Sequence, residues 1–218
     1  MPRFILASQS PRRQDLLKTV GLDFEVVVSS SDESYPETMP IQDVPAFIAK
    51  NKAIAVANIL ANISLAENSS NGKASNNQLF NKYEVSSDNC IIAADTIVVL
   101  DHSVMGKPLN REDAILSLTK LSGHTHEVIT GVCIFYQNDF IVFSETTKVK
   151  FHPLTQQQIM YYVDQYKPYD KAGGYAIQEW IGLVGIDSIH GDFYNVMGLP
   201  VSRLMQKIKQ LGLIDKLL

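Results

Sequence analysis

The sequence has no excess of basic residues, because its 218 residues include 19 Lys and Arg against 23 Asp and Glu, for a net charge of −4. General nucleic-acid-binding proteins carry a basic surface, so this balance argues against a stable nucleic-acid partner. The sequence also lacks an apolar run long enough to span a bilayer, and Arg3 interrupts the N-terminus too early for a secretory leader. We therefore expect a cytoplasmic protein with no membrane partner.

Cysteine is scarce, and the common nucleotide-binding signatures are missing. Cys90 and Cys133 each lie in an apolar, strand-like run, and no CxxC or Cys/His spacing indicates zinc, so we expect buried, reduced thiols. Neither GxxxxGK[ST] nor GxGxxG occurs, which excludes by motif a P-loop enzyme and a dinucleotide-binding Rossmann domain. The absence of GxSxG argues against a serine hydrolase.

What is present is typical of a soluble globular enzyme: 45% of the residues are hydrophobic and 19% are charged. Strand-like and helix-like segments alternate in the first half, whereas the second half carries a hairpin, so we predict an α/β fold with a mixed sheet. The expected strands are residues 4–7, 24–28, 91–100, 127–136, 140–151 and 183–189, and the expected helices are residues 11–20, 44–63, 111–122, 156–166 and 200–211.

Residues 64–89 differ from the rest in composition. They contain polar, turn-forming stretches such as ENSSNGK at 67–73 and SNN at 75–77. Such segments bury too little apolar surface to form a core. We interpret 64–89 as a tolerated polar surface insertion without chemistry, within a single domain of residues 1–218.

Two adjacent arginines follow the first predicted strand. Ser10 is a good N-cap for the next helix and Pro11 suits its first position, which places Arg12 and Arg13 in the first turn. That turn already favours anions, so two cations there are unfavourable for the helix unless they hold a polyanion such as phosphate. A solvated arginine pair explains the local pattern equally well.

Asp95 interrupts the apolar run IIAADTIVV at residues 91–99. A carboxylate in such a run is costly unless it is paired, hydrogen-bonded or bound to a metal. The position therefore favours a general base or a metal ligand over the alternative, an aspartate that bonds to backbone amides at the end of a strand.

Two lysines add to the candidate cations. Lys52 shares one helical face with apolar residues at a spacing of four, and Lys107 follows a turn in Gly106-Lys107-Pro108. Each ammonium group extends either to solvent or into a cleft. Together with Arg12 and Arg13, the two lysines would supply about the charge that a triphosphate requires.

Two further polar residues are candidates. Glu33 is a loop carboxylate that could complete a Mg²⁺ site with Asp95, although a solvated loop acid explains its neighbours better. Gln178 follows a diglycine, where a side-chain amide can read the edge of a base or can simply lie on the surface.

In order along the chain, these segments resemble the Maf (septum-formation) family of nucleoside triphosphate pyrophosphatases. The resemblance covers nearly the whole chain, and the combination of segments is specific although each one alone is not. The matching segments are ILASQSPRR at 5–13, Asp32-Glu33, Lys52-Ala53, ADTIV at 94–98, GKP at 106–108, LSG at 121–123 through TGV at 130–132, DKAGGYAIQ at 170–178 and VMGLP at 196–200.

The resemblance implies an elongated mixed β-sheet flanked by helices, two lobes around a deep cleft, and a homodimer. It implies hydrolysis of a nucleoside triphosphate to the monophosphate and pyrophosphate with a divalent cation, Mg²⁺ or Mn²⁺. It also implies roles for nine residues: Asp95 as the catalytic proton acceptor, Glu33 and Lys52 in the catalytic cluster, Glu33 and Asp95 at the metal, Ser10, Arg12, Arg13, Lys52 and Lys107 at the phosphates, and Arg12, Thr96 and Gln178 in base selection.

The segments SPRR and YAIQ look like the branch of the family that acts on dTTP and UTP. The alternatives are a pyrophosphatase for 7-methyl-GTP or another modified nucleotide, and a nucleotide-binding regulator of septation without turnover. The chain departs from the family pattern in the 64–89 insertion and in Gly106, where many members carry an acidic residue.

Overall fold

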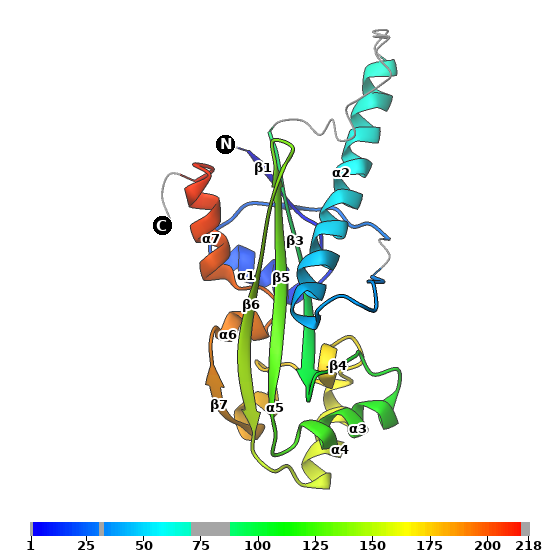
Figure 1. The fold of residues 1–218 in the computed structure, drawn as a ribbon, viewed down its shortest axis with the longest axis vertical. Helices are drawn as coiled ribbons and strands as arrows, with labels where there is room; N and C mark the ends of the chain where they lie inside the picture. Colours follow the sequence, from blue (N-terminus) through cyan, green and yellow to red (C-terminus); the bar gives the residue numbers. More distant parts are fainter. Residues whose placement is uncertain (1, 31–32, 71–87, 215–218) are drawn as a thin grey trace.

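The computed structural model describes residues 2–30, 33–70 and 88–214, with side chains described outside 63–70. One seven-stranded sheet has the order β2-β1-β3-β5-β6-β7, with β4 paired to β3, and runs along the long axis of the molecule (Figure 1). The β1–β2 and β1–β3 pairs are parallel and the other pairs are antiparallel, so the predicted mixed sheet is confirmed. The strands are β1 (Arg3–Leu6), β2 (Glu25–Val26), β3 (Asn89–Leu100), β4 (Ser103–Met105), β5 (Thr125–Tyr136), β6 (Asp139–Phe151) and β7 (Ile186–His190).

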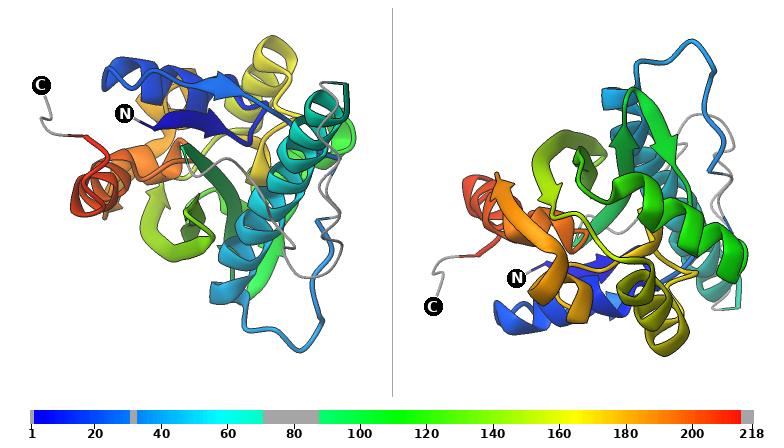
Figure 2. Two further views of the ribbon diagram at one scale, coloured as in Figure 1. Left: turned by 90° about the horizontal axis from the view of Figure 1, so that it is seen from above. Right: turned by 90° about the horizontal axis from the view of Figure 1, so that it is seen from below.

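Helices cover both faces of this sheet. The long helix α2 packs on one face, and α1 and α7 pack on the other (Figure 2). Three further helices, α3, α4 and α5, lie together near the end of the molecule that is farther from β1 and α7 (Figure 1). The helices are α1 (Pro11–Thr19), α2 (Val44–Ser70), α3 (Arg111–Leu121), α4 (Gln156–Tyr166), α5 (Trp180–Gly185), α6 (Phe193–Val196) and α7 (Val201–Gln210), with short 3₁₀ turns at Ile41–Asp43 and Ala172–Gly174.

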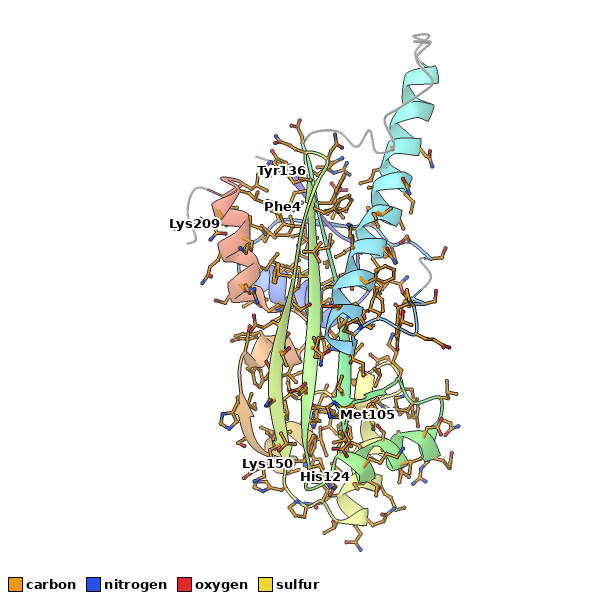
Figure 3. All side chains as sticks on the ribbon, viewed as in Figure 1. Phe4, Met105, His124, Tyr136, Lys150 and Lys209 are labelled. Carbon is orange, nitrogen blue, oxygen red and sulfur yellow. The ribbon has the colours of Figure 1, made fainter. Side chains whose placement is uncertain are left out.

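The sheet is long because β3, β5 and β6 each exceed ten residues. Phe4 and Tyr136 therefore lie near one end of it, and His124 and Lys150 lie near the other (Figure 3). Apolar clusters line the two faces separately: odd-numbered residues of β3 such as Ile91 face α2, and even-numbered ones face α1, α3 and α7.

Local sequence signals explain several element boundaries. The Asn110 side chain accepts a hydrogen bond from the Asp113 amide at 2.9 Å and starts α3, as predicted. Thr155 and Gln158 form the predicted capping box at the start of α4. Both thiols are buried and free, and burial raises the pKa of Cys90 and of Cys133 to about 12.

Some local predictions were wrong. Ser10 occupies the N-cap of α1, but its side chain makes no capping bond, and its amide donates to the Ser8 hydroxyl at 3.2 Å. Residues 183–185 were expected to begin a strand but belong to α5. The apolar run from Trp180 has no periodicity that would distinguish a helix from a strand. The strand expected at 24–28 is limited to β2, which pairs with β1 at two positions.

The segment expected as an insertion at 64–89 is only partly described. Helix α2 continues through residues 64–70, and β3 already begins at Asn89. Residues 71–87 lie outside the described residues, as does Asp32, so the insertion and the single-domain boundary stay predictions.

One helical stretch, Ile41–Asn62, is long and apolar enough by length and composition to cross a membrane, contrary to the expectation that the sequence has no such run. In the fold it serves as a core helix. Its residues Ala49, Ala53 and Val56 are completely buried and pack in one cluster with residues of β1, β3 and β5.

An open stretch in the sheet edge determines where the site lies. On one side, β3 pairs with β1 as far as Ile92 and with β4 only from Val98, so the intervening residues have no strand neighbour there within the described ranges. Every second carbonyl group of β3 points to this open side. The Ile92 carbonyl accepts a hydrogen bond from the Ala7 amide. The Ala94 carbonyl lies beyond the end of β1 and therefore needs a donor from another part of the chain.

Candidate functional site

A small hollow opens at this stretch of β3, and a larger hollow adjoins it. The small hollow has a volume of about 130 Å³ and the large hollow about 440 Å³. Both are bounded by α1 and α2, by the segment after β4, and by the loop that precedes α5. Their shared wall consists of six residues: Ser10, Arg12, Arg13, Lys52, Lys107 and Asp170.

The hollows concentrate positive charge in an acidic protein. Among the described residues that line them, five are Lys or Arg and three are Asp or Glu, whereas the whole chain has a net charge of −4. The lining therefore carries an excess of positive charge, which raises the local concentration of negatively charged ligands. The site therefore suits a small polyanion.

Lys52 connects the two carboxylates that the sequence pointed to. Its Nζ lies 2.7 Å from Oδ1 of Asp95 and 2.7 Å from Oε1 of Glu33. The Lys52 and Asp95 side chains are only 16% and 14% exposed, whereas that of Glu33 is 52% exposed. The hydrogen bond from Lys52 holds the pKa of Glu33 below its usual value, so this carboxylate is ionised at neutral pH.

The close approach of α2 to the sheet explains why Lys52 reaches Asp95. Both side chains lie on the α2 face of the sheet, between one apolar cluster that contains Ile91 and another that contains Ile97. On β5, Gly131 pairs with Asp95, and the backbone at Pro45 and Ala46 sits where a side chain at Gly131 would be. The missing side chain therefore lets α2 approach the sheet beside the carboxylate.

Arg13 occupies the open edge of β3. Its Nη1 donates to the Ala94 carbonyl at 2.8 Å and to the Ser8 hydroxyl at 3.2 Å, and its Nε donates to the Gly198 carbonyl at 2.8 Å. Its Nη2 donates to Thr96 Oγ1 at 3.0 Å. Burial lowers the pKa of Arg13, although a guanidinium group stays charged. Because four of its five N–H groups serve the protein, Arg13 supports the floor of the site and has one N–H left for a ligand.

Arg12 takes part in a second charged cluster. Its Nη1 donates to Asp170 Oδ2 at 3.2 Å, and Oδ1 of Asp170 accepts from Lys171 Nζ at 2.7 Å. Burial raises the pKa of Asp170, but the hydrogen bonds from Lys171 and Arg12 outweigh it and hold the pKa below its usual value. The Lys171 side chain is 9% exposed and lies 3.6 Å from Oε1 of Glu179.

The remaining candidates, Ser10, Thr96, Lys107 and Gln178, also line the hollows. Lys107 and Gln178 are exposed, and neither side chain has a hydrogen bond within the described part of the chain. Thr96 Oγ1 lies 2.9 Å from Thr130 Oγ1, on the face of β3 opposite Asp95. Ser10 borders both hollows at the start of α1.

The structure thus places all nine residues singled out in the sequence at the two hollows. Glu33 borders the large hollow, and Asp95, Thr96 and Gln178 border the small one. Sequence reasoning did not select Asp170 and Lys171, which also line the site. The signal was available, because only Ala172 separates this charged pair from the diglycine before Gln178.

Comparison with known proteins gives a consistent result. The family described as Maf-like protein matches residues 3–211. A dTTP/UTP pyrophosphatase of Parabacteroides distasonis is 46% identical over 208 residues, which cover 95% of each chain. Proteins of the same name from Phocaeicola vulgatus and Bacteroides fragilis are 44% and 40% identical over 210 residues, which cover 96% of each chain. These matches confirm the resemblance that the sequence segments carry.

Proposed function

Because the chain belongs to the Maf-like protein family, we propose that it is a nucleoside triphosphate pyrophosphatase that hydrolyses dTTP and UTP to the monophosphate and pyrophosphate. One observation carries the proposal: the Asp95 carboxylate, held by Lys52 at 2.7 Å, faces a hollow whose wall supplies the cations for a triphosphate. The names of the relatives supply the reaction and the two nucleotides.

Asp95 acts as the proton acceptor in this proposal. A water molecule attacks the α-phosphorus and gives its proton to the carboxylate, the bond from the α-phosphorus to the bridging oxygen breaks, and pyrophosphate leaves with the electron pair. The hydrogen bond from Lys52 Nζ to Asp95 Oδ1, at 2.7 Å, fixes the orientation of the carboxylate.

The phosphates bind to the cations of the shared wall. Arg12 and Lys107 supply most of the donors, because the Arg13 guanidinium is largely occupied by the protein. Ser10 adds a hydroxyl at the N-terminus of α1, where backbone N–H groups favour an anion. Charge stabilisation of this kind provides much of the rate in phosphoryl chemistry.

A divalent cation fits the donor set. Glu33 and Asp95 face one point, the Lys52 ammonium, and carboxylate oxygens are the ligands that Mg²⁺ and Mn²⁺ prefer. The described residues contain no cluster of three or more metal-ligating side chains, and a Mg²⁺ ion that bridges protein and substrate needs only one or two carboxylates. Glu33 and Asp95 are the residues that would hold the cation, and the cation would neutralise phosphate charge.

Base selection falls to Arg12, Thr96 and Gln178, which border the small hollow. The Gln178 amide offers one acceptor and two donors, which match the O4 and N3–H groups of uracil and thymine. We propose further that the enzyme acts in the cytoplasm as a homodimer. The dimer is tested by the molar mass that light scattering records during size-exclusion chromatography.

The experiment that tests the function is a pyrophosphate-release assay with a panel of canonical and modified triphosphates, in Mg²⁺, in Mn²⁺ and in EDTA. We expect turnover of dTTP and UTP that requires the divalent cation. Turnover confined to 7-methyl-GTP or another modified nucleotide would reassign the substrate. Tight nucleotide binding without pyrophosphate release would support a regulatory protein in place of an enzyme.

A further inference from the structure

Building on the proposed function, we propose that Tyr162 is a positioning residue for base selection. Its hydroxyl fixes the loop Tyr175–Glu179, which carries Gln178 into the small hollow. Tyr162 lies on α4, is completely buried and does not line either hollow.

The Tyr162 hydroxyl holds the loop on both sides of Gln178. It accepts a hydrogen bond from the Ala176 amide at 3.1 Å and donates one to Oε2 of Glu179. Ala176 is 5% exposed, so its amide depends on this acceptor. One hydroxyl group thus satisfies a buried donor before Gln178 and a carboxylate directly after it.

The loop backbone is closely packed against α5. The Glu179 amide donates to the Ala176 carbonyl at 3.1 Å, and the Gly182 amide donates to the Glu179 carbonyl at 2.9 Å. A Cβ atom at Gly182 would lie 1.7 Å from the Ile177 carbonyl oxygen, so α5 touches the loop backbone. Since the Gln178 side chain has no hydrogen bond within the described ranges, the loop backbone sets the position from which this side chain extends into the small hollow.

The same hydroxyl connects Gln178 to Arg12, the other side chain that we propose for base selection. Beyond Glu179, the chain of contacts runs through Lys171 at 3.6 Å and Asp170 at 2.7 Å to Arg12 at 3.2 Å. A polar chain that ends on Tyr162 therefore connects the Arg12 side chain to the loop that carries Gln178.

This arrangement predicts an effect on selectivity and little effect on the chemical step. The hydrogen bonds of Tyr162 go to the loop, whereas Asp95 is held by Lys52 on α2. A site that hydrogen-bonds a base discriminates because the wrong base leaves polar groups unpaired, and this requires the amide to be held in place. A loosened loop lets Gln178 adapt to a wrong base, so discrimination falls.

The test compares Tyr162→Phe with wild type, and uses Tyr161→Phe as the matched control. Tyr161 is the neighbour on α4, 49% exposed, with its ring against Trp180. For each protein, kcat and KM are measured with UTP and CTP, which differ at the base edge that an amide reads. We expect the ratio of kcat/KM for UTP over CTP to fall about tenfold in Y162F, through KM, with kcat for UTP within twofold. Y161F should match wild type.

Coupling to Gln178 separates positioning from a general structural role. Gln178→Ala should lower the same ratio, and Y162F should lower it no further in the Q178A background, because both changes remove one interaction. Glu179→Ala, which removes the acceptor of the hydroxyl, should reproduce the Y162F ratio and gives a second route if Y162F fails to fold. Equal losses for UTP and CTP in the folded variants, or an unchanged ratio, would overturn the inference.

Measurements on the wild-type protein distinguish failure of the proposed function from failure of the inference about Tyr162. If it releases no pyrophosphate from any nucleotide, the proposed function fails. The inference is then tested by the binding of α,β-imido analogues of UTP and CTP, whose affinity ratio should fall in Y162F and persist in Y161F. If the wild-type protein binds neither analogue, both proposals are wrong.

Discussion

Gly131→Ala is the substitution whose effect can be worked out most fully from the structure. Gly131 lies in β5 opposite Asp95, and its φ is outside the left-handed region, so alanine suits its backbone. A Cβ atom there would lie 2.1 Å from the Ala46 amide nitrogen and 2.2 Å from the Pro45 carbonyl carbon. Ordinary contacts begin near 3.4 Å, so α2 or β5 must move by about 1.3 Å.

The expected loss has two parts. Overpacking of this kind costs about 1–3 kcal/mol of the free energy of unfolding. A shift of α2 by about 1 Å also carries Lys52 away from Asp95, and a misplacement of that size lowers turnover about 100-fold. We therefore expect a lower melting temperature together with about 1% of the wild-type kcat for UTP.

The assays are thermal unfolding and pyrophosphate release, each normalised to folded protein. Gly106→Ala is the matched control, because a Cβ atom at Gly106 meets nothing within 4 Å, and it should match wild type in both assays. Wild-type turnover in a destabilised G131A variant would refute the claim that this contact sets the distance from Lys52 to Asp95.

Three further outcomes are expected. Asp95→Asn should lower kcat at least about 100-fold while the melting temperature is retained, because the proton acceptor is lost; near-normal turnover would remove Asp95 from the mechanism. Glu33→Gln should lower the free energy of unfolding at pH 7 by no more than about 1 kcal/mol, because the pair with Lys52 is half exposed. Folding lowers the pKa of Glu33, so its contribution to the free energy of unfolding is present above the unfolded pKa near 4.5 and is lost as the pH falls through the lowered pKa. Urea titrations at pH 7 and pH 3 should therefore show the difference in the free energy of unfolding between wild type and E33Q disappear at the lower pH. Chelation of divalent cations by EDTA should abolish pyrophosphate release, and added Mg²⁺ or Mn²⁺ should restore it; unchanged release in EDTA would exclude a metal requirement.

The sequence predicted the fold best where a local rule acts alone. The caps at Asn110 and Thr155 and the hairpin of β5 and β6 follow from turn and capping chemistry. Residues 183–185 were wrongly assigned to a strand, because an apolar run without periodicity suits a helix and a strand alike. β4 was missed because three residues carry too little pattern and form a strand only by pairing with β3.

The candidate site was predicted as a set of residues but not as a geometry. Asp95 stood out because an ionised group in an apolar strand is costly, and the structure places the Lys52 ammonium beside it. The carbonyl partners of Arg13 could not be predicted, because they belong to residues 81 and 185 positions away in the sequence and local pattern carries no signal for such contacts. Asp170 and Lys171 were passed over because a charged pair in a loop is usually solvated.

The Arg13 guanidinium, which lies in the gap between β1 and β4, affects how variants of this residue should be interpreted. Removing it would break the 2.8 Å hydrogen bonds to the main-chain oxygens of Ala94 and Gly198 at once, so an Arg13 variant is expected to lose its conformation and its turnover together. A mutational survey scored on enzymatic output alone would then classify Arg13 with the ligands of the triphosphate, although the larger share of its contribution is architectural. Only abundance measured alongside output, variant by variant, separates the two.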